Sequence, residues 1–275
     1  MFSSCKKENP GNGDTDLEQP EVPNNGNGNG NGNGDGNGNG NGEPWAGVNF
    51  TQADVDVLKL HKVYFGHKSV GGNIVTGIKR ISDLNIRTAY NQPERNDESL
   101  RTTIQQLSGG PAFVEHDLGS DGLPFAKIAS FERFMNDIIH DNVDVAFFKF
   151  CYMDIDARTD INALIAAYQA AMDRLHTHFP KVIIAHFTIP LYYRTASFDN
   201  NKREQFSNWL RETYKDKVFD IAAIESVDSK GNTAVSWDNV TIAMADEWTN
   251  DGGHLNEAGQ NQIGGSLIAF LAQLF

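Results

Sequence analysis

Short apolar runs alternate with longer amphipathic segments over residues 45–275. Apolar side chains recur at helical spacing between the runs, most clearly from Ile161 to Leu175 and from Ile263 to Leu274. The runs are apolar at successive positions, which is typical of strands that are covered on both faces. The five predicted strands are Lys62–Gly66, Ala112–Asp117, Val143–Cys151, Lys181–Phe187 and Val218–Ile221.

Strands that alternate with helices predict βαβ units, and hence an α/β domain with a mostly parallel five-stranded sheet and helices on both faces. In such sheets ligands bind beyond the carboxyl ends of the strands. Residues that directly follow the predicted strands are therefore candidates for a site. They include His67 and Ser69 after the first strand, Gly119 after the second, and Tyr152 and Asp154 after the third.

Residues 1–44 have the composition of a tail. Residues 25–42 are almost entirely an Asn-Gly repeat, and neither residue type contributes to a packed core. We therefore expect a disordered tail and flexible linker over residues 1–44 and one folded domain over residues 45–275. The linker composition suits a tether between an anchor and a domain, and equally a spacer in any secreted protein.

Two serines precede Cys5, and lysines and a polar stretch follow it. This order resembles the junction of a bacterial lipoprotein, in which the cysteine carries the lipid. The resemblance implies lipidation at Cys5, membrane contact only through that anchor, and an extracytoplasmic location at the bacterial cell envelope. The alternative is an unstructured N-terminal segment with an unrelated cysteine.

The chain is acidic, with 36 Asp and Glu against 23 Lys and Arg and a net charge of −13. It offers no basic stripe to follow a phosphate backbone, so nucleic acid is not an expected partner. No stretch approaches the ~20 apolar residues that a membrane span requires. Cys5 and Cys151 lie in a tail and in a predicted strand, and we expect no disulfide between them.

The stretch WTNDGGHLNEAGQ near the C-terminus contains Asp251 and His254, with two glycines between them. A carboxylate this close can accept the Nδ1–H of the histidine and orient its ring. Nε2 is then available to take a proton from a hydroxyl. Asp251 is also explained as a turn residue and His254 as a loop histidine, so their combination is the informative feature.

Ser69 lies in the stretch GHKSVGGN, where the first strand gives way to a helix. Amides at a helix N-terminus favour negative charge, so the Ser69 amide and a Gly119 amide suit a tetrahedral oxyanion. These features predict that Ser69 is a nucleophile served by His254. Taken alone, Ser69 is better explained as a helix cap, and its combination with Asp251 and His254 favours the nucleophile.

The blocks FGHKSVGGNI and DGGH resemble those of the SGNH/GDSL hydrolase superfamily, in a divergent branch that lacks the usual Gly-Asp-Ser. The resemblance covers residues 62–275. It implies a three-layer α/β/α sandwich with a flavodoxin-like sheet, and serine ester hydrolysis without metal or cofactor. It also implies that Ser69 is the nucleophile, His254 the general base and then acid, and Asp251 the orienting carboxylate.

Two departures from the family pattern concern the substrate-binding groups. The Gly-x-Asn-Asp block is replaced by KFCYMDID, in which only Asp154 matches, so the Asn that donates to the oxyanion is missing. Loss of such a donor costs about 10²–10³ in turnover, and Tyr152, Lys149 and Asn73 are the open replacements. His67 has three open roles: it binds substrate, polarises a carbonyl or braces the loop.

The sequence thus predicts a serine ester hydrolase that removes acyl groups, expected to be acetyl, from a carbohydrate or similar ester. Its expected partner is a small-molecule or glycan ester. The alternative is a weakly active or inactive domain on the same scaffold that binds a glycan or surface polymer. A cofactor-binding flavodoxin-like protein shares the fold but leaves Asp251 and His254 unexplained.

Overall fold

The computed structural model describes residues 50–89, 96–194 and 196–275. The predictions for residues 1–44, namely the tail, the Asn-Gly linker and lipidation of Cys5, lie outside the described residues, as does the domain boundary at residue 45. Within the described ranges no helix combines the length and the apolar content needed to cross a membrane.

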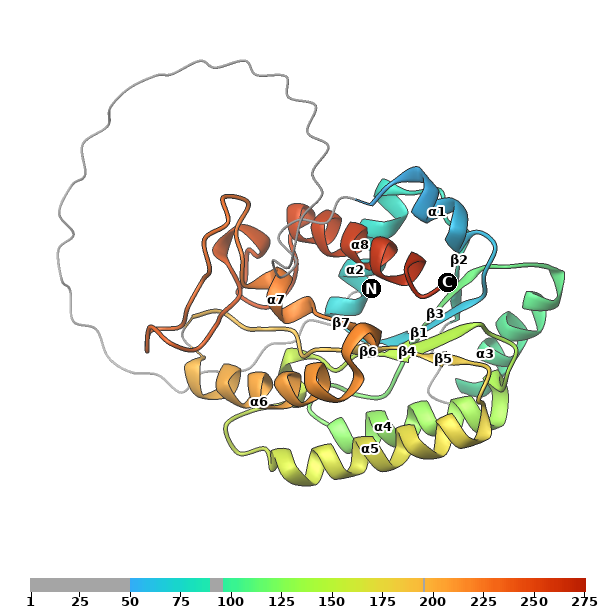
Figure 1. The fold of residues 1–275 in the computed structure, drawn as a ribbon, viewed down its shortest axis with the longest axis horizontal. Helices are drawn as coiled ribbons and strands as arrows, with labels where there is room; N and C mark the ends of the chain where they lie inside the picture. The colour runs from blue at the N-terminus through green and yellow to red at the C-terminus, as the bar shows by residue number, and fades with distance from the viewer. Residues whose placement is uncertain (1–49, 90–95, 195) are drawn as a thin grey trace, which may run out of the picture. The chain divides into compact units, whose positions relative to one another are not determined.

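All strand pairs in the described part of the chain are parallel (Figure 1). The main sheet has five strands, in the spatial order β2 (Ile86–Ala89), β3 (Phe113–Asp117), β1 (Val63–His67), β4 (Val145–Phe148) and β5 (Ile183–Ile184). A two-stranded sheet follows, made of β6 (His186–Phe187) and β7 (Val218–Phe219). Ala185 separates β5 from β6, yet its amide still donates to the Ala146 carbonyl of β4 at 3.1 Å.

Each predicted run contains a strand, and the mostly parallel α/β sheet is confirmed. Three details of the prediction are wrong. The run Lys181–Phe187 forms two short strands, β5 and β6, and not one. The fifth strand of the main sheet is β2, which was not predicted, and the run Val218–Ile221 gives the short strand β7, after which Ile221 already opens a helix. Without β2, the order β3-β1-β4-β5/β6-β7 is the flavodoxin-like one.

Helices cover both faces of the sheet, so the domain has three layers (Figure 1). Side chains alternate along β1: Phe65 packs into the core on one face and Tyr64 into the core on the other. The helices on the Phe65 face are α1 (Gln52–Leu58), α2 (Val70–Ile81), α7 (Ile221–Glu225) and α8 (Glu257–Ala272). Those on the Tyr64 face are α3 (Asn96–Gln105), α4 (Pro124–Phe134), α5 (Ile161–His178) and α6 (Ser197–Tyr214).

Helices α2 and α8 pack closely through glycines. A Cβ built on Gly77 of α2 would lie 1.9 Å from the Gln260 carbonyl oxygen of α8, and one built on Gly264 would lie 2.9 Å from the Ile78 amide nitrogen. Only hydrogen fits at these positions. The contact sets the helix that begins after Ser69 beside the helix that follows the Asp251/His254 loop.

Candidate active site

Ser69 stands at the junction between β1 and α2. Its backbone has a φ of 52° and a ψ of −109°, a strained combination for a residue with a side chain and one that persists at functional sites. Its side chain makes no capping hydrogen bond to α2. The Oγ atom lies instead 2.8 Å from Nε2 of His254. The turn therefore presents the hydroxyl to an imidazole and not to its own helix.

The His254 ring lies between the hydroxyl of Ser69 and the carboxylate of Asp251. Its Nδ1 is 2.7 Å from Oδ2 of Asp251, and its Nε2 faces a serine that is 185 positions away in the chain. A carboxylate that accepts Nδ1–H leaves Nε2 as the proton acceptor. The structure thus brings the three predicted catalytic residues together in the order hydroxyl, imidazole and carboxylate.

Asp251 is fixed by its own loop. Its Oδ1 accepts hydrogen bonds from the amides of Gly253 at 3.0 Å and His254 at 2.8 Å. Partial burial opposes ionisation, but these two amides and the His254 ring outweigh it and hold the pKa of the Asp251 carboxyl below its ordinary value. The Gly252 amide donates to Thr249 Oγ1 at 2.9 Å, which tightens the turn.

The two glycines of the loop let it approach an aromatic pair. Gly252 has a φ of 87°, and a Cβ built on Gly253 would lie 2.5 Å from Cζ of Tyr152. The Tyr152 ring meets the His254 ring edge-on, with centroids 5.9 Å apart, and lies 5.0 Å from the Tyr192 ring. Tyr152, a predicted substrate-binding residue, is therefore placed beside the imidazole.

His67 lies beneath the first turn of α2, only 3% exposed. Its Nε2 is 3.0 Å from Oε2 of Glu115, whose other oxygen accepts from Lys79 Nζ at 2.8 Å and from Thr88 Oγ1 at 2.6 Å. Burial opposes ionisation of Glu115, but the three partners lower its pKa to about 2. Of the three roles left open for His67, this buried position favours bracing of the loop.

The same ring explains one of the paired glycines. A Cβ built on Gly71 would lie 2.3 Å from the Cβ of His67 and 2.7 Å from its Nδ1. A Cβ built on Gly72 would meet no atom within 4 Å. Gly71 is therefore required by the imidazole beneath it, whereas Gly72 is not required by packing.

Asp154 lies in a buried ion pair. Its Oδ2 accepts from Lys127 Nζ and from the Cys151 amide, both at 2.6 Å, and its Oδ1 accepts from the Gly122 amide at 2.7 Å. Lys127 also donates to Asp121 at 2.7 Å. The Asp154 side chain is 0% exposed. The prediction that it binds substrate is therefore corrected: it joins the loops after β3 and β4.

Gly119 lies at the carboxyl end of β3, next to the end of β1. The two strands pair with His67 opposite Asp117, so Ser69 and Gly119 each lie two residues beyond the last pair. Gly119 has a φ of 64°, and a Cβ there would lie 2.8 Å from Cγ of Lys127, so glycine alone fits. Two candidate oxyanion amides thus lie at the ends of neighbouring strands.

Asn73 joins the helix of Ser69 to the loop of His254. Its Oδ1 accepts a hydrogen bond from the Leu255 amide at 3.3 Å. Its side-chain nitrogen, Nδ2, is the group that can donate to an oxyanion. Lys149, in contrast, is 1% exposed and donates its Nζ to the Phe150 carbonyl at 2.9 Å. Of the three groups left open as oxyanion donors, Tyr152 and Asn73 therefore remain.

Two buried residues of α6 hold the aromatic pair, and the sequence analysis missed both. Arg203 donates from Nε to the Tyr152 carbonyl at 2.9 Å. Asn200 accepts from the Tyr192 amide at 3.0 Å and donates to its carbonyl at 2.8 Å. A signal for them existed: Asn200, Arg203 and Ser207 recur at helical spacing on the buried face of α6.

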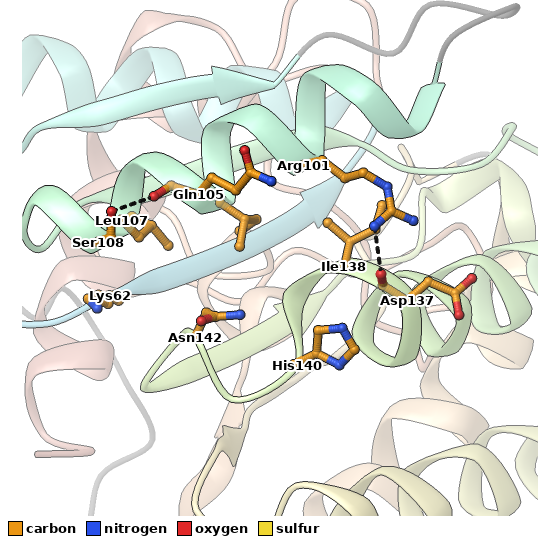
Figure 2. A pocket seen from close by; sticks show the side chains of 10 residues that line it. Lys62, Arg101, Gln105, Leu107, Ser108, Asp137, Ile138, His140 and Asn142 are labelled. Carbon is orange, nitrogen blue, oxygen red and sulfur yellow. Dashed lines mark hydrogen bonds between the residues drawn. The ribbon is translucent and has the colours of Figure 1, made fainter.

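A separate cavity of about 640 Å³ lies at the amino ends of β1 and β4 (Figure 2). Arg101 donates there to the Asp137 carbonyl at 3.0 Å, with His140 and Asn142 nearby. None of the predicted catalytic residues lines it.

In the described part of the chain, no cluster of three or more His, Cys, Asp or Glu side chains is arranged to hold a metal ion.

No protein-family model and no curated protein matches this chain. Among solved structures, it is similar to a member of the lipolytic protein G-D-S-L family from Veillonella parvula, at 15% identity and a TM-score of 0.39, over 75% of this chain and 95% of that one. It is also similar to a carbohydrate esterase family 3 protein from Talaromyces cellulolyticus, at 14% identity and a TM-score of 0.40, over 78% and 97%. Both comparisons are alignments of the backbone, at low sequence identity.

Proposed function

We propose that this protein is a serine ester hydrolase of the SGNH type. One observation carries the proposal: Ser69 Oγ, the His254 ring and the Asp251 carboxylate form a continuous hydrogen-bonded chain with distances of 2.8 and 2.7 Å. The strained backbone of Ser69 supports it, because strain of this kind is retained where function requires it.

In the proposed reaction His254 takes the proton of Ser69 as Oγ attacks the ester carbonyl. The tetrahedral intermediate collapses when the imidazolium returns that proton to the leaving alkoxide, which departs as an alcohol. A water molecule then gives a proton to His254 and attacks the acyl-enzyme. The carboxylic acid leaves and the proton returns to Ser69. Asp251 stabilises the imidazolium in both halves of the cycle.

The oxyanion is proposed to lie against the amides of Ser69 and Gly119. Amides at the start of a helix have no partner within that helix, and the α2 dipole favours negative charge there. Tyr152 beside His254, or the side-chain nitrogen of Asn73, is proposed to supply the donor that the missing Asn would provide.

We propose a small acyl group, acetyl in the first instance, on a carbohydrate or similar alcohol. The support for this choice is that enzymes of the SGNH/GDSL hydrolase superfamily, which the two sequence blocks resemble, commonly act on such esters. Aryl esters of increasing chain length test it, because an acetyl-specific site loses activity as the chain grows.

The test of the nucleophile is hydrolysis of an aryl acetate by wild-type protein and by Ser69→Ala. The variant should retain the fold and lose at least 10³-fold in rate. Ser108→Ala, which removes an exposed hydroxyl bonded to the Gln105 carbonyl, should leave the rate unchanged. Full activity in Ser69→Ala would refute the assignment. An inert wild-type protein that binds glycans would support the non-catalytic alternative.

A further inference from the structure

A second cavity, of about 410 Å³, lies among loops at the same end of the sheet as Ser69. Most of its lining comes from the long loop between α7 and α8, which also carries Asp251 and His254. The lining residues that bear on its chemistry are Arg194, Val235, Ser236, Trp237, Asn239 and Met244. No residue of the proposed triad is among them.

The cavity is joined to the catalytic loop through one short segment. The Tyr193 amide donates to the Gly252 carbonyl at 2.9 Å, directly after Asp251 in the chain. The next carbonyl, that of Arg194, accepts from the Trp237 amide at 3.1 Å. Two successive hydrogen bonds therefore fix the position of Trp237 relative to the loop that holds His254.

Trp237 is presented to solvent by a rigid turn, with 71% of its surface exposed. The Ser236 amide donates to the Thr241 carbonyl at 2.7 Å, which closes the turn. The Asp238 carboxylate accepts from the amides of Val240 and Thr241 at 3.0 and 2.9 Å. The backbone that carries the ring is held in this way, so a ligand that covers Trp237 has to order only its side chain, which has two χ angles.

The other lining groups define the ligand. Ser236 is 1% exposed, and its hydroxyl has no hydrogen-bond partner among the described residues. Asn239 offers an amide. Among the described residues that line the cavity, Arg194 is the charged one, and it is paired with Asp246. An aromatic face, neutral polar groups and a paired charge suit an uncharged ligand with one apolar face and many hydroxyls.

We propose that this cavity, the Trp237 subsite, binds the sugar portion of the ester, with a neutral pyranose ring stacked on Trp237. The proposal rests on the proposed function only for the position of the acyl group, because the sugar can bind without any hydrolysis of the ester. The alcohol portion of the ester is then a neutral oligosaccharide.

Binding is tested with Ser69→Ala, which cannot turn over substrate, by calorimetry against cellohexaose, xylohexaose, mannohexaose and chitohexaose. At least one should bind, and Trp237→Ala in that background should weaken binding at least tenfold, while Trp237→Phe stays within threefold. Phe198→Ala removes an 81% exposed ring outside the cavity and should change nothing. Absence of binding to all four, or equal binding by Trp237→Ala, would overturn the proposal.

Kinetics separate the subsite from the catalytic proposal. In Trp237→Ala, KM for the acetylated form of an oligosaccharide that binds should rise at least fivefold with kcat unchanged, whereas hydrolysis of an aryl acetate, which carries no sugar, reports on the triad. Equal KM values in the two proteins would reject the subsite and leave the esterase proposal intact. If wild-type protein hydrolyses neither ester yet binds sugar through Trp237, the esterase proposal fails and the subsite stands.

Discussion

The imidazole of His67 occupies the space that a side chain on Gly71 would need, since a Cβ built there would lie 2.3 Å from the Cβ of His67. Gly71→Ala must therefore displace the ring or the first turn of α2. Overpacking costs about 1–3 kcal/mol, and a shift of reacting atoms by ~1 Å costs about 10²-fold in rate. We expect losses of this size in urea unfolding and in aryl acetate hydrolysis.

Gly72→Ala is the matched control for this change. Its new Cβ meets no atom within 4 Å, and alanine in a helix is favoured over glycine by roughly 0.5–1 kcal/mol. The variant should be slightly more stable than wild type and fully active. Equal losses in both variants would show that the start of α2, and not the His67 ring, sets the cost.

Glu115 gives the domain a pH-dependent contribution to stability. Burial opposes its ionisation, but His67, Lys79 and Thr88 lower its pKa from 4.5 to about 2. The unfolded chain therefore takes up the proton first as pH falls, so this stability is present above pH 4.5 and is lost toward pH 2. The shift corresponds to about 3 kcal/mol.

Glu115→Gln should remove this contribution. Its unfolding free energy, measured in urea, should fall less steeply than that of wild type between about pH 5 and pH 3. Parallel curves for the two proteins would mean that Glu115 does not carry the predicted pKa shift.

Asp251→Asn tests the orienting role of the carboxylate. An amide retains an acceptor for the Gly253 and His254 amides, so the loop should keep its shape. The imidazole loses a negative partner and its tautomer is no longer fixed, which predicts a fall in kcat of about 10³–10⁴. Steady-state rates and circular dichroism check activity and fold, and a fall of less than tenfold would argue against the role.

The buried pair Lys127–Asp154 should be far more important for stability than an exposed pair. Lys127→Met leaves the Asp154 carboxylate buried without its cation, which costs about 3–5 kcal/mol. Arg174→Met breaks the ion pair of Arg174 with Glu132, where the arginine side chain is 53% exposed, and should cost less than about 1 kcal/mol. Similar losses in the two variants would contradict the assignment of a buried, supporting network.

The sequence predicts the strands that are buried on both faces, because such strands are continuous apolar runs. β2 was missed since Arg87 and Thr88 lie within it and it occupies the sheet edge, where polar side chains are tolerated. The break at Ala185 and the two-residue strands beside it depend on the path of neighbouring segments. No local pattern encodes that path.

The contacts of the candidate site also divide into local ones, which the sequence predicts, and long-range ones, which it does not. Asp251 and His254 are three residues apart, so their contact follows from local geometry and was predictable. The Glu115 partner of His67 and the Arg203 contact to Tyr152 join residues 48 and 51 positions apart. Such contacts depend on tertiary packing, and only the polar stripe on α6 hinted at one of them.

The central proposal is that Ser69 Oγ becomes covalently bonded to the acyl group. The most direct measurement is reaction with a fluorophosphonate followed by intact mass and peptide mapping. We predict one phosphonyl group per chain on the peptide that contains Ser69, none on Ser69→Ala, and slower labelling of Asp251→Asn. Modification of a different residue, or no modification of a protein that still hydrolyses aryl acetates, would contradict the assignment of Ser69 as the nucleophile.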